Sequence, residues 1–261
     1  MPTWIRFEHE DKVNIGQLNQ EVIEIYKGDI FGDNEPTNVS IDYADVTLLP
    51  PCTPSKFLAL WNNFSATAEK AGLPKPEHPW YFVKTPNTYA PANSKIIKPS
   101  ICEGKILFEG ELGIVIGKEC KDVSIENVAD YIFGYTCVND VTALEYLFNE
   151  NDFAHWTRAK SFDGFGVFGP GISTDIEPDD LTIRTYMCGN DHEQERQNYP
   201  VSDMFFKPKE IVSEISKDMT LYPGDVIACG TSVGAGAMKA GWTVRIEIDG
   251  VGTLENIFLE S

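Results

Sequence analysis

Two glutamates separated by one glycine, Glu109-Gly110-Glu111, are the residues whose types and spacing most suggest chemistry. They lie in an apolar run, 108–117, which is typical of a β-strand, and strand residues two apart point to the same face. Gly110 allows another group to approach the backbone closely. Two like charges on one face repel unless a cation neutralises them, and a hard divalent ion such as Mg²⁺ suits carboxylate oxygens. An isolated pair of this kind is more often a solvated strand face, so the rest of the sequence decides.

Three further segments carry polar groups at the ends of apolar runs. Asn139-Asp140 closes one such run, directly before a segment with a helical pattern, and Asp140 taken alone would usually be the N-cap of that helix. Residues 156–163, WTRAKSFD, read as a loop dense in charge and aromatic rings. In PGDVIACGTSVG a strand leads into a turn at Gly230 to Ser232, whose backbone N–H groups and hydroxyls suit a carboxylate.

The elements that must position these residues are mostly strands. Alternating apolar positions with Gly and Asp punctuation predict short strands up to about Leu49, and the prolines at 50–54 mark a linker. We therefore expect a small N-terminal β domain, residues 1–54, and a catalytic domain, residues 55–261. The fold class is mostly β with a few helices (α+β). The later expected elements are strands at 57–63 and 80–83, helices at 65–71, 141–149 and 209–216, and a strand-rich C-terminal part.

Composition excludes several classes of function. The 261 residues include 40 acidic and 21 basic side chains, a formal charge of -19, and such a surface repels phosphate backbones, so no nucleic-acid partner is expected. No apolar stretch is long enough to cross a bilayer, and MPTWIRFEHEDK has no signal-peptide core, so we expect a cytoplasmic protein with no membrane partner. The six cysteines form no C-x-x-C pair, which favours buried thiols in a reducing compartment.

Taken in order, E-G-E, then N-D, then R-A-K-S-F-D, then P-G-D-V-I-x-x-G-T resembles the fumarylacetoacetate hydrolase superfamily, over residues 57–258. The resemblance implies a β-roll fold specific to that superfamily, a small N-terminal domain and a homodimer. It also implies a divalent ion, Mg²⁺ or Mn²⁺, held by Glu109, Glu111 and Asp140.

The resemblance implies roles for four further residues. Lys160 matches the active-site lysine of the family, and Thr231 matches its substrate-carboxylate-binding threonine, with Gly230 and Lys84 also assigned to substrate binding. A 2-oxo acid could chelate the ion through its carboxylate and neighbouring oxygen, and the ion would stabilise the enolate formed when a bond breaks or a proton shifts. Lys160 would add a cation beside that oxyanion. The alternative for Lys160 is an exposed loop lysine.

One departure from the family pattern affects water activation. Hydrolytic members carry N-Y-x-x-H-x-x-E after the first core strand, and here Thr67 stands at the histidine position and Lys70 at the glutamate position. Neither is a competent general base near neutral pH. Glu69 is adjacent but should point to another face of the helix.

Other departures affect substrate contacts. Related enzymes often have an arginine and a glutamine where this chain has Leu144 and Leu147, and a proline where it has Ser232. The predicted metal ligands are thus present while polar substrate contacts are altered.

The sequence therefore predicts a divalent-metal-dependent enzyme acting on a 2-oxo or 2-hydroxy-dienoic acid. Isomerase or decarboxylase chemistry of aromatic-acid catabolism is the first choice, similar to 2-hydroxyhepta-2,4-diene-1,7-dioate isomerase or 5-oxopent-3-ene-1,2,5-tricarboxylate decarboxylase, because neither step needs activated water. An acylpyruvate or fumarylpyruvate hydrolase is the alternative. A non-catalytic paralogue that binds metal and oxo acid is the second alternative.

Overall fold

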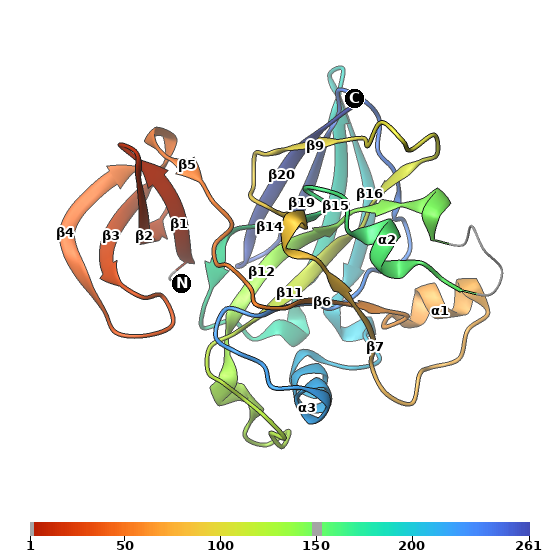
Figure 1. The fold of residues 1–261 in the computed structure, drawn as a ribbon, viewed down its shortest axis with the longest axis horizontal. Helices are drawn as coiled ribbons and strands as arrows, with labels where there is room; N and C mark the ends of the chain where they lie inside the picture. Colours follow the sequence, from red (N-terminus) through yellow and green to blue (C-terminus); the bar gives the residue numbers. More distant parts are fainter. Residues whose placement is uncertain (1–2, 148–152) are drawn as a thin grey trace.

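The largest sheet has twelve strands and joins the N-terminal strands to strands from the rest of the chain (Figure 1). The computed structural model describes residues 3–147 and 153–261. Ten of these strands form a continuous path, and β5 (Thr47–Leu48) and β8 (Tyr89–Ala90) pair with β1 and β14 beside it. Along the path the order is β4 (Asn34–Asp42), β3 (Val22–Gly28), β2 (Lys12–Asn19), β1 (Thr3–His9), β14 (Gly166–Ser173), β12 (Ile132–Asp140), β11 (Gly110–Ile116), β17 (Val226–Ala228), β6 (Phe57–Trp61) and β7 (Trp80–Lys84).

Two smaller sheets and a few helices complete the fold. The five-stranded sheet has the order β16 (His192–Pro200), β15 (Thr182–Gly189), β19 (Thr243–Ile248), β20 (Gly252–Leu259) and β9 (Lys95–Ile97). The three-stranded sheet contains β13 (Thr142–Ala143), β10 (Ile106–Phe108) and β18 (Gly236–Ala237). The α-helices in the described residues are α1 (Ser65–Ala71), α2 (Trp156–Lys160) and α3 (Pro208–Asp218). Short 3₁₀ turns are η1 (Tyr43–Asp45), η2 (Pro86–Thr88), η3 (Val128–Tyr131), η4 (Leu144–Tyr146), η5 (Pro178–Asp180) and η6 (Val201–Asp203).

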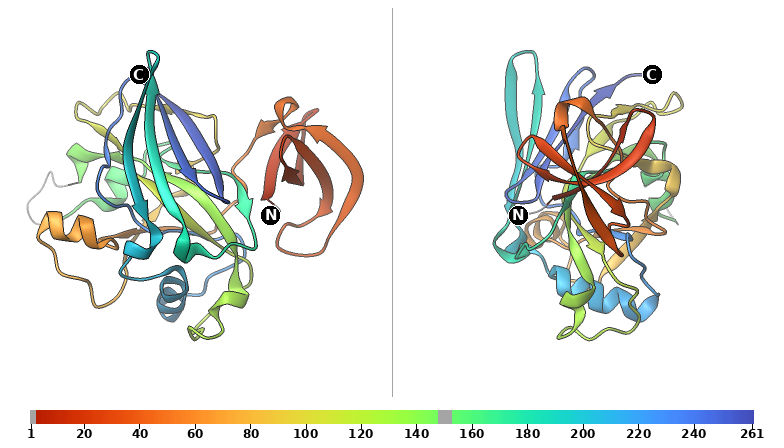
Figure 2. Two further views of the ribbon diagram at one scale, coloured as in Figure 1. Left: turned by 180° about the vertical axis from the view of Figure 1, so that it is seen from behind. Right: turned by 90° about the vertical axis from the view of Figure 1, so that its left-hand side faces the viewer.

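Strands β1 to β5 form a separate group beside the rest of the molecule (Figure 2). β1 to β4 pair as consecutive antiparallel neighbours, and their presence confirms the short strands predicted up to about Leu49. β1 joins this group to the main body, because Thr3 and Trp4 pair with Ser173 and Ile172 of β14. The two parts of the chain therefore share one sheet.

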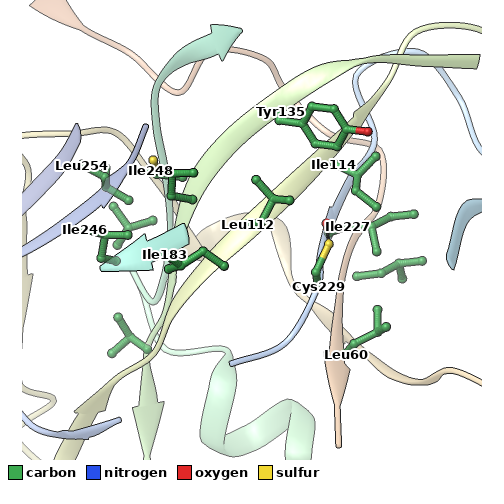
Figure 3. Close-up of a cluster of buried hydrophobic side chains, with 14 of the residues drawn as sticks. Leu60, Leu112, Ile114, Tyr135, Ile183, Ile227, Cys229, Ile246, Ile248 and Leu254 are labelled. Atoms are coloured by element: carbon green, nitrogen blue, oxygen red, sulfur yellow. Dashed lines mark hydrogen bonds between the residues drawn. The ribbon is translucent and has the colours of Figure 1, made fainter. Parts of the chain in front are cut away.

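The main core lies where the long sheet faces the five-stranded sheet (Figure 3). β11 and β12 pack against β15 and β19, and their inward side chains include Leu112, Ile183 and Ile246, each fully buried. β11 is buried along its whole length, which explains why it reads as a nearly continuous apolar run. This rigid, covered strand positions the acidic residues at its start.

The predicted helices at 65–71 and 209–216 are confirmed as α1 and as part of α3. Gly72 ends α1 in a left-handed conformation with φ of 67°. None of the helices within 3–147 and 153–261 is long and apolar enough to span a membrane.

The prediction of a helix over 141–149 is wrong for the part that is described, and residues 148–149 lie outside the described residues. Thr142 and Ala143 pair instead with β10, and only the 3₁₀ turn η4 follows. Residues 156–163 were expected to be a loop, but the first five form α2. In both segments, tertiary pairing and packing outweigh the local pattern.

Candidate metal centre and substrate cleft

Three carboxylates meet where β11 begins and β12 ends. Gly110 pairs with Asn139, so Glu109 and Glu111 flank the strand end that carries Asp140. One oxygen from each carboxylate can be chosen so that all three lie within 4.8 Å of one another. Glu111 and Asp140 are fully buried, and Glu109 is partly exposed. The predicted convergence of these three side chains is therefore present in the structure.

Glu111 has one oxygen that is held and one that has no partner. Its Oε2 accepts a hydrogen bond of 2.8 Å from the backbone N–H of Gly230, whereas its buried Oε1 has no hydrogen-bond partner. Burial, together with the nearby Asp140 and Glu109 charges, raises the pKa of Glu111 well above its ordinary value. A buried carboxylate oxygen that has no partner and lies among like charges is available to coordinate a cation, so these residues fit a hard divalent ion.

Two buried lysines stabilise the charge on Asp140. Lys160 Nζ lies 2.5 Å from Asp140 Oδ2 and 2.7 Å from Glu109 Oε2. Lys84 Nζ lies 2.5 Å from Asp140 Oδ1 and 2.8 Å from the carbonyl oxygen of Lys160. Burial acts to raise the pKa of Asp140, but the two ammonium groups outweigh it and hold this pKa below its usual value.

The pKa values of the two lysines shift in opposite directions. Burial acts to lower the pKa of Lys160, but Asp140, Glu109 and Glu111 outweigh burial and raise it. The pKa of Lys84 is lowered, chiefly by its complete burial. Lys160 lines a cleft beside the carboxylates and is not an exposed loop residue, and its catalytic role stays a prediction. Lys84 is fully buried behind Asp140 and is not part of that lining, so its position fits a partner of Asp140 better than the expected substrate contact.

A hydrogen-bonded network fixes the backbone of Gly110 between the two glutamates. Gln197 accepts from the Gly110 N–H at 3.0 Å and donates to Thr231 Oγ1 at 2.8 Å. Thr231 Oγ1 and the Tyr199 hydroxyl both donate to the Gly110 carbonyl. A Cβ atom at Gly110 would collide with Thr185 Oγ1, which explains the glycine at this close approach.

Gln197 and Tyr199 were missed at the sequence level. They are the two buried residues on β16, in HEQERQNYP, whose other members are exposed or half-buried. Their spacing of two residues, which places both on one face of a strand, is the one signal in this polar run that could have identified them.

The cleft has a volume of about 170 Å³. Thr67 lines it and donates a hydrogen bond of 3.4 Å to the carbonyl oxygen of Thr231. Glu69 and Lys70 are exposed on another face of α1, so the expectation that Glu69 points elsewhere is correct. The lining residues, all within the described ranges, are Leu60, Trp61, Asn62, Thr67, Phe82, Glu109, Leu147, Trp156, Lys160 and Thr231.

The positions where polar contacts were expected to be altered differ in exposure. Leu147 belongs to the cleft lining, whereas Leu144 is 40% exposed and lies outside it. Ser232 is buried next to Thr231, and its hydroxyl has no hydrogen-bond partner. The Gly230 N–H donates to Glu111, so Gly230 holds one of the three carboxylates in place.

The fold and the acidic centre agree with the comparison to known proteins: the chain belongs to the fumarylacetoacetate hydrolase family. The family model described as fumarylacetoacetate (FAA) hydrolase C-terminal matches residues 56–258, and the Rv2993c-like N-terminal model matches residues 3–51. Among its sequence relatives is protein Rv2993c of Mycobacterium tuberculosis, 39% identical over 229 residues, which are 87% of this chain and 83% of the relative.

Two solved structures are similar over nearly the whole chain. The 2-hydroxyhepta-2,4-diene-1,7-dioate isomerase of Mycobacterium marinum has a TM-score of 0.89 and 35% identity, covering 100% of this chain and 99% of that one. The 5-carboxymethyl-2-hydroxymuconate delta-isomerase of Mycobacterium smegmatis has a TM-score of 0.89 and 34% identity, covering 99% and 100%.

Proposed function

We propose that this protein is a divalent-metal-dependent enzyme that isomerises or decarboxylates a small 2-oxo or 2-hydroxy-dienoic acid. The observation that carries the proposal is the set of three convergent carboxylates with Lys160 at the wall of a cleft. The described lining contains no histidine, and Thr67 stands where a hydrolase would place one. The likeness to two solved isomerases supports the same class of reaction.

Each residue of the centre has a part in this reaction. Glu109, Glu111 and Asp140 would hold the ion, which when bound supplies positive charge that favours the enolate form of the acid. Lys160 presents an ammonium group at the cleft wall, where it adds to that charge as the oxygen becomes negative. Thr231 lines the cleft, where its hydroxyl accepts a hydrogen bond from Gln197 and its carbonyl oxygen accepts one from Thr67.

Metal binding can be tested separately from turnover. Calorimetry with Mg²⁺ and Mn²⁺ should show one strong site in the wild type, and Glu111→Gln should weaken it by at least about tenfold, because a neutral amide is a poorer ligand than a carboxylate. Glu119→Gln changes an exposed glutamate just after β11 and serves as the matched control. Equal affinity in the wild type and Glu111→Gln would exclude the proposed centre.

The reaction is tested by giving one metal-loaded preparation three compounds: oxaloacetate, an acylpyruvate and a 2-hydroxy-dienoic acid. We expect decarboxylation or double-bond isomerisation to exceed acylpyruvate cleavage. Fast cleavage would establish the hydrolase instead, and binding without any turnover would establish the non-catalytic paralogue. The homodimer implied by the resemblance and the cytosolic location expected from the sequence stay predictions, to be tested by light scattering and by fractionation.

A further inference from the structure

The lining of the cleft has a polar part and an apolar part. Glu109, Lys160 and Thr231 form the polar part. The apolar part contains three aromatic rings, with Trp156 in contact with the other two. The Trp156 ring centroid lies 5.2 Å from that of Trp61 and 5.2 Å from that of Phe82, on which the Trp156 ring stacks. Leu60 and Leu147 also line the cleft and are buried. We call these five side chains the apolar wall. Because its rings come from β6, β7 and α2 and support one another, the wall is a preformed surface.

The charges around the cleft leave room for one anion. Three carboxylates against two ammonium groups leave one net negative charge, so a divalent ion would leave one net positive charge. An acid with a single carboxylate neutralises that excess. A second carboxylate would be buried without a counter-charge, which is costly.

The described lining offers no separate cation for a second carboxylate. Lys160 is the one cationic side chain among the lining residues, and its ammonium is already paired with Glu109 and Asp140. Asn62 donates its amide to the Pro74 carbonyl at 3.0 Å, which leaves its buried carbonyl oxygen unpartnered. That oxygen accepts hydrogen bonds and so repels a carboxylate. Arg158 is exposed, with its guanidinium over the Tyr146 ring.

We propose, resting on the function proposed above, that the natural substrate is a 2-oxo acid with one carboxylate and a short apolar tail that packs on the apolar wall. A volume of about 170 Å³ limits the tail to a few carbons. This assignment favours a proton shift over loss of CO₂ from a diacid such as oxaloacetate, because only the second reaction needs another carboxylate. The proposed substrate differs from a dioate in carrying an apolar group in place of the second carboxylate.

The test compares two isosteric acids in calorimetry with the Mg²⁺-loaded protein. In 5-methyl-2-oxohexanoate an isopropyl group replaces the distal carboxylate of 2-oxoglutarate, and the rest of the molecule is the same. The branched acid should bind at least about tenfold more tightly, because its apolar group is buried without loss of ionic hydration. Equal binding, or tighter binding of 2-oxoglutarate, overturns the assignment.

Leu147→Arg adds a cation to the apolar wall and should shift the ratio of the two affinities toward 2-oxoglutarate by at least about tenfold. Leu144→Arg adds the same charge three residues away, outside the lining, and should leave the ratio unchanged. An unchanged ratio in folded Leu147→Arg overturns the assignment. If Leu147→Arg does not fold, the ratio of the two affinities is measured in Leu147→Gln instead, and the comparison of the two acids in the wild type tests the assignment by itself.

Pyruvate, which has no tail, separates this inference from the function on which it rests. Metal-dependent pyruvate binding without a preference between the isosteres would refute the apolar tail alone. Absence of metal-dependent pyruvate binding would refute the proposed function itself.

Discussion

Replacing Lys160 with methionine should produce a protein whose stability depends on the metal. The Lys160 side chain is 2% exposed and pairs with both Glu109 and Asp140. Without its ammonium, Glu109 loses its ion-pair partner and Asp140 keeps only Lys84. Breaking a buried pair by removing one partner costs about 3 to 5 kcal/mol. At roughly 2 to 4 °C per kcal/mol for a chain of this size, the metal-free variant should melt roughly 6 to 20 °C below the wild type.

A divalent ion should largely restore this loss, because it supplies positive charge among the same carboxylates. Calorimetric melts in EDTA and in Mn²⁺ measure the effect. Lys56→Met is the matched control, because Lys56 pairs with buried Asp225 at 2.7 Å, away from the cleft. The decrease in melting temperature that this substitution causes should be the same with and without metal.

Turnover of metal-loaded Lys160→Met should still fall by about 10² or more, since a charge beside the developing oxyanion is missing. Metal affinity should not fall, because the ammonium competes with the ion for Glu109 and Asp140. The reasoning would be refuted if metal-free Lys160→Met had the same melting temperature as the metal-free wild type. It would also be refuted if the variant lost metal and kept full turnover.

Three further predictions follow from neighbouring features. Gly110→Ala should weaken Mn²⁺ binding by at least about tenfold in calorimetry, because the new Cβ collides with Thr185 Oγ1 and moves both glutamates. Gly32→Ala controls for the methyl group, because a Cβ atom there would have its nearest neighbour, Asp29 Cβ, at 3.4 Å. Because the pKa of Glu111 is raised, its contribution to metal-free stability is complete below its ordinary pKa of 4.5 and is lost as pH rises through the raised pKa. In EDTA the melting temperature of the wild type should therefore fall more steeply with pH than that of Glu111→Gln, and an equal slope would contradict this. Glu69→Ala should leave kcat unchanged, because Glu69 is exposed on α1; a collapse of acylpyruvate cleavage would make Glu69 the general base.

The acidic centre was predicted from a local pattern together with the family resemblance, which supplied Asp140 as the third carboxylate. The i, i+2 spacing of Glu109 and Glu111 defines one strand face, and Asp140 ends an apolar strand that pairs with it. The structure brings these carboxylates together as expected. The helix at 65–71 was equally local, because Gly72 terminates it.

Features built by distant segments could not be derived in this way. The apolar wall combines β6, β7 and α2, and nothing in any one segment indicates that their rings meet. The burial of Lys84 depends on Asp140 and Lys160, which are 56 and 76 residues away. Residues 141–147 were misassigned because pairing with β10, not helical periodicity, determines their conformation.

The pairing of β1 with β14 imposes an order on folding during synthesis. Thr3 and Ser173 are 170 residues apart, and their side chains are hydrogen-bonded in the finished protein. At roughly 5 to 20 residues per second, the ribosome makes β14 about 10 to 30 seconds after β1. The hairpins of β1 to β4 can close early, and β5 can pair with Phe7 and Glu8 of β1, but Thr3 and Trp4 have no β14 to pair with during that interval. The growing chain therefore carries an open strand edge, of the kind that chaperones shield, until its catalytic half is well advanced.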